Sequence, residues 1–173
     1  MKHLVVAGSF AASILSNSAY SESHLPIEAA CPDGEKIYFS CETTRSKLIR
    51  LCAAEVNGST SSLTYFFGTI DNPELTQAAS PENNFEPFRF NHYFRYGADY
   101  FRVSFVRGGY RYEIYKDYDM EETPAERSGI IVSSIKDASK EVDIECRGKA
   151  SGSLSPLSSI LKCDKDNALG CAN

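Results

Sequence analysis

The fold is decided by residues 100–117, which have the sequence YFRVSFVRGGYRYEIYKD. Apolar and polar residues alternate on both sides of the Gly108-Gly109 pair, and two glycines supply the positive φ angles that a two-residue hairpin turn needs. Pairing residue 107 with residue 110 places Val103 opposite Ile114 and Phe105 opposite Tyr112, on one buried face. The same register predicts a polar face that carries Arg102, Ser104, Arg111, Glu113 and Tyr115.

Two more hairpins are expected, one on each side of this one. The first pairs residues 37–41 with residues 48–52 across a turn at 43–46, and the second pairs residues 129–135 with residues 141–146. In the second hairpin, acidic residues alternate with apolar ones over the last strand. This pattern is typical of a half-buried strand with an acidic outer face.

The rest of the chain also favours short strands. Residues 63–67 alternate as a further strand does, whereas residues 71–84 contain two prolines and are expected to form a turn-rich connector. One short C-terminal helix is expected, with Ser155 as its N-cap and Pro156 at the first helical position. About eight strands and one short helix predict an all-β fold, an antiparallel β-sandwich or a small barrel.

The N-terminus has the three zones of a secretory signal. A cationic start at Lys2 precedes an apolar run over residues 4–15 and small residues that end at Ser21. The run is roughly 18 Å long as a helix, too short for the ~30 Å hydrocarbon core of a bilayer. We therefore predict a signal peptide over residues 1–21, one β domain over residues 22–173, no membrane span, and a periplasmic or secreted location.

The charge of the chain argues against nucleic acid as a partner. The net charge is −5 at neutral pH, and loss of Lys2 with the signal makes the mature protein more acidic still. Neutralising phosphates requires a basic face, which an acidic domain rarely offers. Acidic clusters lie at residues 117–122 and 164–167, but neither has the glycine-turned loop of a dedicated calcium site, so we expect solvated loops and no metal or other cofactor.

Six cysteines follow the signal and are expected to form three disulfides: Cys31, Cys41, Cys52, Cys146, Cys163 and Cys171. The sequence has no Cys-x-x-Cys motif and no histidine near a cysteine, so zinc binding by these cysteines is not expected. Six thiols allow fifteen connectivities. The register of the first hairpin turns Cys52 away from Cys41 and toward residue 36, which predicts the pair Cys31–Cys52. The other four cysteines are expected to tie the C-terminal part to the first sheet.

Thirteen of the twenty Phe and Tyr residues and five arginines lie within residues 85–118. In one interpretation the aromatic side chains fill the core and the arginines solvate the outer face. In the other, the outer face is a protein-binding surface, because Arg and Tyr often carry the binding energy of interfaces. The candidate partner-binding residues are Arg89, Arg95, Arg102, Arg111, Tyr115, Asp117 and Asp119.

The sequence offers little to an enzyme. It contains no Gly-x-Ser-x-Gly motif, and His92 lies in an alternating segment where we expect a hydrogen-bonded histidine on a strand. A pair of carboxylates can meet from anywhere in a fold, so a hydrolase of the glycosidase type remains an alternative. The acids considered for it are Asp99, Glu113, Asp117 and Asp119.

Several short motifs together resemble a group of small, largely uncharacterised exported proteins of proteobacteria. The motifs are Cys31-Pro32-x-Gly34, Phe39-Ser40-Cys41, Lys47-Leu48-Ile49-x-Leu51-Cys52, Tyr65-x-Phe67-Gly68 and Pro73-Glu74-Leu75. The resemblance covers residues 31–75, extends loosely to Tyr115, and implies a periplasmic β domain without implying an activity. In size, export and disulfide use the chain is also similar to periplasmic lysozyme inhibitors and to toxin-immunity proteins.

The sequence therefore favours an exported, non-enzymatic protein-binding module. We expect an inhibitor or immunity-type protein whose partner is a toxin or a cell-wall hydrolase. The alternatives are the small hydrolase and an envelope structural protein. A eukaryotic secreted origin is a further alternative, in which Asn57-Gly58-Ser59 would be a glycosylation acceptor. The oligomeric state is not indicated.

Overall fold

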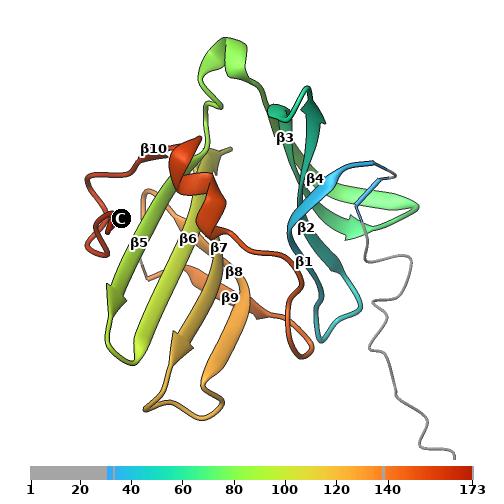
Figure 1. Cartoon of the computed structure of the whole chain (residues 1–173). Helices are drawn as coiled ribbons and strands as arrows, with labels where there is room; N and C mark the ends of the chain where they lie inside the picture. Colours follow the sequence, from blue (N-terminus) through green and yellow to red (C-terminus); the bar gives the residue numbers. More distant parts are fainter. Residues whose placement is uncertain (1–30, 33, 138, 173) are drawn as a thin grey trace, which may run out of the picture.

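The structure is a computed structural model that describes residues 31–172 except Asp33 and Ala138. The signal peptide expected over residues 1–21 lies outside the described residues. The described chain forms two β-sheets that lie against each other, with the C-terminal segment running past both (Figure 1). The predicted all-β fold, an antiparallel β-sandwich or a small barrel, is confirmed.

Among the described residues, ten strands form the two sheets. The four-stranded sheet, in the order β1-β2-β3-β4, consists of β1 (Lys36–Glu42), β2 (Leu48–Val56), β3 (Ser59–Thr69) and β4 (Asn72–Ala79). The six-stranded sheet, in the order β10-β5-β6-β7-β8-β9, consists of β5 (Arg89–Arg95), β6 (Ala98–Arg107), β7 (Tyr110–Asp119), β8 (Glu126–Ser134), β9 (Glu141–Glu145) and β10 (Lys162–Cys163). The described residues also form two 3-10 helices, Pro81–Asn83 and Ser155–Ser159.

The central hairpin has the predicted register. Val103 pairs with Ile114, and Phe105 pairs with Tyr112, across the Gly108-Gly109 turn. The inner faces of the two sheets enclose the core, where the ring of Tyr65 from β3 lies 5.0 Å from the ring of Phe105, centroid to centroid. Both rings are fully buried, so aromatic contacts stabilise the packing of one sheet on the other.

The first hairpin confirms the predicted Cys31–Cys52 disulfide. Cys41 pairs with Ile49, and a β-bulge between Ile37 and Phe39 brings Cys52 opposite Ile37. The bulge shifts the register by one residue, so Cys52 points away from Cys41 and bonds to Cys31. The expected hairpin of β8 and β9 is also present.

The connector expected over residues 71–84 is wrong for most of its length, because β4 occupies Asn72–Ala79. Proline is tolerated on an edge strand and at an irregularity, and Pro73 meets both conditions. It pairs with Gly68 where the β3–β4 register shifts. Gly68 has φ +140°, and a Cβ there would lie 2.7 Å from the carbonyl oxygen of Asn72, so this close approach requires glycine.

The C-terminal helix is present but differs in type and start. It is a 3-10 helix over Ser155–Ser159 whose N-cap is Leu154, not Ser155. The amide of Leu157 donates to the carbonyl of Leu154 at 2.9 Å, the three-residue spacing of this tighter helix. Leu157 and Leu161 are buried in the core.

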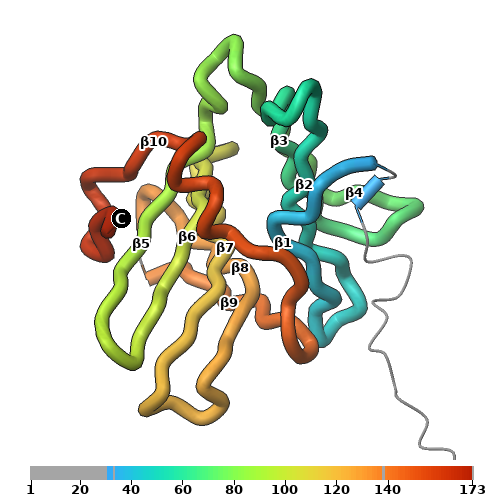
Figure 2. The backbone as a smooth tube through the Cα atoms, viewed as in Figure 1, coloured from blue at the N-terminus to red at the C-terminus, as the bar shows by residue number. Residues whose placement is uncertain are grey.

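The remaining cysteines form two different kinds of bridge. Cys41–Cys146 links β1 to the end of β9, as expected for a tie to the first sheet. Cys163–Cys171 instead closes a local loop within the C-terminal segment, so the expected tie was wrong for this pair. The chain after β9 runs along β1, where Ser151 bridges Ser40, and then returns to the far edge of the six-stranded sheet as β10 (Figure 2).

Candidate protein-binding surface

The outer face of the six-stranded sheet collects all seven candidate partner-binding residues. Since Phe90, Val103 and Ile114 point into the core, strand alternation turns the neighbouring residues of β5, β6 and β7 outward. The residues turned outward are Arg89, Arg95, Arg102, Arg111, Tyr115, Asp117 and Asp119. Sharing a face does not make them equally accessible, because many are bound to one another.

Arg102 is at the centre of this face and is 9% exposed. Its Nη2 donates to Oδ2 of Asp117 at 2.7 Å, its Nη1 donates to the other oxygen, and its Nε donates to Oε1 of Glu113 at 3.2 Å. The guanidinium also lies over the ring of Tyr115, 5.2 Å from the centroid. A guanidinium group is well suited to bidentate pairing with a carboxylate and to stacking on a ring, and here both partners belong to the protein itself.

Tyr115 continues the network toward β9. Its hydroxyl donates to Oδ1 of Asp143 at 2.9 Å, and burial raises the pKa of that hydroxyl. The ring lies over Gly129, where a Cβ would be 2.9 Å from the tyrosine hydroxyl and 2.4 Å from the carbonyl oxygen of Ile144. Sequence reasoning missed Gly129; a glycine inside an otherwise apolar strand segment is the signal of such a close approach.

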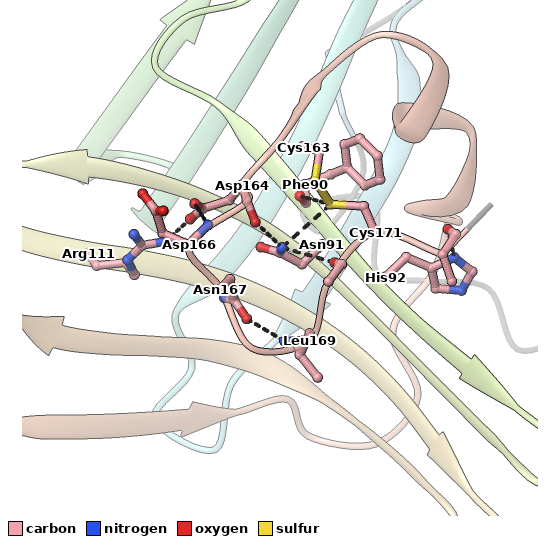
Figure 3. The surroundings of a disulfide bond; sticks show 12 residues. Phe90, Asn91, His92, Arg111, Cys163, Asp164, Asp166, Asn167, Leu169 and Cys171 are labelled. Carbon is pink, nitrogen blue, oxygen red and sulfur yellow. Dashed lines mark hydrogen bonds and ion pairs between the residues drawn. A yellow bond between two sulfur atoms is a disulfide. The ribbon is translucent and has the colours of Figure 1, made fainter.

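The C-terminal loop, residues 164–170, packs on the outer face beside Asn91 and Arg111 (Figure 3). Arg111 donates through Nη1 to Oδ2 of Asp164 at 2.7 Å. Burial acts to raise the pKa of Asp164, but the hydrogen bonds from Arg111 and from the amide of Asp166 outweigh it and lower the pKa below its usual value. The acidic cluster at 164–167 is therefore not simply a solvated loop, because the carboxylate of Asp164 is bound to Arg111 of the sheet.

Asn91 fixes this loop from below. Its side chain is fully buried, and Nδ2 donates to the carbonyl oxygens of Asp164 at 2.8 Å and Gly170 at 3.0 Å, the first and last residues of the loop that the Cys163–Cys171 disulfide closes (Figure 3). The carbonyl of Gly170 also accepts from the backbone amide of His92 at 3.1 Å, so both the backbone and a side chain of β5 bind the loop.

The other charged residues of the face are paired as well. Arg89 contacts Glu86 at 2.6 Å. Tyr100 donates its hydroxyl to Asp119, and this bond, with that from the amide of Glu121, lowers the pKa of Asp119. Arg95 is 3.7 Å from the same carboxylate, with nearly half of its side chain exposed. The charged side chains at the centre of the outer face are therefore bound to other residues of the protein. More accessible side chains lie toward the β5–β6 turn.

Five exposed side chains surround that turn, and we call them the aromatic end. Its members, with their exposed fractions, are Tyr93 (37%), Phe94 (64%), Tyr96 (89%), Tyr118 (43%) and Met120 (53%). They come from β5, the β5–β6 turn, β7 and the loop after β7. Tyr93 also stacks on Tyr100 across the hairpin, with centroids 5.7 Å apart.

The two loops of the aromatic end are joined to each other. The amide of Met120 donates to the carbonyl of Gly97 at 2.8 Å. Gly97 has φ +80°, and a Cβ there would lie 2.4 Å from Sδ of Met120, so glycine lets the methionine pack on the turn. Exposed acids lie beside this joint, at Glu121 and Glu122 in the β7–β8 loop.

His92 is hydrogen-bonded on its strand, as the sequence predicts. Its Nδ1 lies 2.8 Å from the carbonyl oxygen of Ala172, and its Nε2 lies 2.9 Å from Oδ1 of Asp99. Both ring nitrogens are thus engaged, and the contact with Ala172 fastens the end of the chain to β5.

Neither a metal centre nor a membrane helix is found in the part of the chain that the structure describes. Among residues 31–172, apart from the two left out, no three or more His, Cys, Asp or Glu side chains converge as metal ligands do. Within the same residues no helix is long and apolar enough to cross a bilayer. Three disulfides are typical of proteins that mature in an oxidising compartment.

Comparison with known proteins adds no relative: no family model, no curated protein and no solved structure matches this chain. The site is therefore interpreted from its own geometry.

Proposed function

We propose that the protein is an exported, non-enzymatic binding module whose aromatic end contacts another protein. The observation that carries this proposal is the clustering of Tyr93, Phe94, Tyr96, Tyr118 and Met120 around one turn, each more than a third exposed. Several large exposed apolar side chains at one end of a sheet are typical of an interaction site, and Tyr, Phe and Met are enriched at protein interfaces.

The scaffold favours contact with a partner of fixed shape. The aromatic end is built on paired strands, and its two loops are joined by the Met120–Gly97 hydrogen bond and by side-chain packing. A surface that is ordered before binding loses little conformational freedom when the partner arrives.

The acidic surroundings support a cationic partner. Glu121 and Glu122 are exposed beside the aromatic end, and the chain as a whole carries a net charge of −5. Opposite charge accelerates encounter and selects among partners. An inhibitor or immunity-type protein of the periplasm, acting on a basic toxin or cell-wall hydrolase, fits these features and the resemblance to exported proteins.

The hydrolase alternative receives less support from the same contacts. Glu113 and Asp117 both accept from Arg102, Asp119 accepts from Tyr100, and Asp99 contacts His92. These acids are bound by donors of their own sheet, so we propose contact and not hydrolysis.

Pull-down from a periplasmic extract tests the proposal. The mature protein is compared with a Tyr96→Ser/Met120→Ser variant, and with a Val56→Ser/Ile70→Ser control that alters two similarly exposed apolar residues of the other sheet. A captured protein is then purified and its binding measured by calorimetry at low and high salt. We expect the wild type and the control to bind, and the aromatic-end variant to lose at least tenfold in affinity.

The same captured protein is assayed with and without the binding module. Inhibition of its activity by the wild type, and not by the Tyr96→Ser/Met120→Ser variant, is the expected result. Equal capture by all three proteins, or binding that is insensitive to salt, contradicts the proposal.

A further inference from the structure

A groove lies on the inner side of the six-stranded sheet and borders the aromatic end, with which it shares Tyr118. It has a volume of about 530 Å³ and is bounded by β6, β7 and β8 on one side and by residues 146–155 on the other. Its volume is within the range of pockets that bind small organic molecules. Neither Tyr96 nor Met120 lines it.

The wall formed by residues 146–155 is held in place. The Cys41–Cys146 disulfide fixes its start, and Ser151 exchanges two backbone hydrogen bonds with Ser40, at 3.1 and 2.8 Å. Gly152 passes so close to β1 that a Cβ there would lie 2.7 Å from the backbone of Tyr38. The groove therefore exists without a ligand, and binding does not have to pay for its formation.

The groove combines an apolar wall with charged residues. Four carboxylates line it, and each already has a partner: Asp99 contacts His92, Asp117 accepts from Arg102, Glu126 pairs with Lys149 and Glu145 pairs with Arg127. Phe101 of β6 faces Ala150 and Leu154 of the returning segment, and all three are at least 95% buried. Tyr118 and Pro124 line the open side. Closely packed walls of this kind favour the hydrocarbon or aromatic body of a ligand.

Among the described residues, Lys116 is the basic residue of the groove that lacks a counter-ion, whereas Arg127 pairs with Glu145. Nζ of Lys116 donates to the carbonyl oxygen of Gly152 at 2.6 Å, and no carboxylate among the described residues lies within ion-pair distance. By contrast, Lys149 pairs with Glu126 at 2.9 Å. An ammonium group has three donors, so Lys116 keeps two for a ligand. Burial lowers the pKa of Lys116 below its usual value.

We propose that this groove binds an amphipathic carboxylate, with the carboxylate on Nζ of Lys116 and the apolar body against Phe101 and Leu154. A carboxylate supplies the counter-ion that Lys116 lacks, and a charge-assisted hydrogen bond in a partly dry groove is stronger than one in water. An amine would meet an ammonium of the same sign. This site is additional to the proposed protein-binding function and does not depend on it.

Decanoate is the probe for the test, with decanol and decylammonium as ligands of equal chain length and different head group. Calorimetry below the micellar range is expected to show saturable one-to-one binding of decanoate, and at least tenfold weaker binding of the other two. Backbone NMR shifts are expected to concentrate at Lys116, Ser128 and Ala150. No saturable binding of decanoate, or equal binding of the three, overturns the proposal.

Two variants separate the charge of Lys116 from the general charge of the groove. Lys116→Met keeps the apolar stem and is expected to weaken decanoate binding at least tenfold, whereas Lys149→Met, which removes an exposed and paired lysine, is expected to change it less than threefold. Ser128→Phe, which fills the groove from β8, is a second variant and is expected to abolish binding. Unchanged binding in folded Lys116→Met or Ser128→Phe protein overturns the proposal.

Discussion

Arg102 links several side chains on the outer face of the six-stranded sheet. It contacts carboxylates at two positions of β7 and stacks on Tyr115, although its side chain is only 11% exposed. An isolated charge at such a site would be costly, so the three charged groups are stable there because each has hydrogen-bonded partners. The same pairing makes Arg102 unavailable as a contact residue for a partner.

Replacement of Arg102 by leucine is expected to destabilise the protein by about 3 kcal/mol, because it leaves Glu113 and Asp117 partly buried without a counter-ion. Urea unfolding measures the loss. The control is Arg127→Leu, which removes an arginine whose side chain is 47% exposed and which pairs with Asp143 and Glu145. Exposed pairs contribute less than about 1 kcal/mol, so equal losses in the two variants would show that the Arg102 network is no more than a surface feature.

The sequence could assign these residues to a face but not to partners. The Gly108-Gly109 turn fixes the register of the hairpin, and alternation then places Arg102, Arg111 and Tyr115 on one side. The ligand of Arg111 is 53 residues away in the chain, at Asp164. Local patterns carry no information on such a contact, and so the burial of the predicted surface was not foreseen.

At the scale of elements, the strands whose alternation and turn residues agree were predictable, whereas a strand that contains proline and one that forms only by pairing were not. Alternation and turn residues mark the hairpin of β6 and β7 and that of β8 and β9. The strand β4 was missed because a proline such as Pro73 argues against a strand unless the strand lies at the edge of a sheet. The sequence does not show that β4 is an edge strand. The strand β10 has two residues and exists because it pairs with β5, not because of its own sequence.

The C-terminal loop is expected to be bound less strongly to the sheet at acidic pH. The pKa of Asp164 is below its usual value in the folded protein, so the Arg111–Asp164 pair contributes stability above the unfolded pKa of about 4. That contribution disappears as the pH falls through the lower, folded pKa. The difference in free energy of unfolding between wild type and Asp164→Asn is therefore expected to be about 1 kcal/mol at pH 6, and to shrink steadily below pH 4.

Urea unfolding at a series of pH values measures this difference. Asp166→Asn is the control, because Asp166 is exposed in the same loop and makes no ion pair with any described residue. Its difference from wild type is expected to stay near zero throughout. A difference for Asp164→Asn that persists undiminished at pH 2 would mean that the carboxylate charge is not what holds the loop.

At the scale of the whole molecule, two unlike connections hold the sheets together. The core contact of Tyr65 with Phe105 depends on complementary shape, whereas Cys41–Cys146 is a covalent bond between β1 and the end of β9. The bond also fixes the start of the segment that forms one wall of the groove and leads to the C-terminal loop. Sheet packing, groove and loop position thus share one covalent anchor.

The two bridges with the most different loop lengths are expected to differ in their effect on stability. Cys41–Cys146 spans 105 residues and Cys163–Cys171 spans 8. In the chain-entropy account these loops correspond to about 4.8 and about 2.5 kcal/mol of lost unfolded-state freedom. Replacing both cysteines of each pair by serine, followed by urea unfolding, is expected to cost roughly twice as much for the first pair.

The two serine variants are also expected to differ in where the structure loosens. Without Cys41–Cys146, hydrogen exchange should increase along residues 146–155 and in β1, because their shared anchor is lost. Without Cys163–Cys171, the increase should be confined to the C-terminal loop, since Asn91 and Arg111 still bind it to the sheet. Equal losses of stability, with exchange rising over the whole chain in both variants, would mean that the sheets depend on their core packing and not on the covalent bond between them.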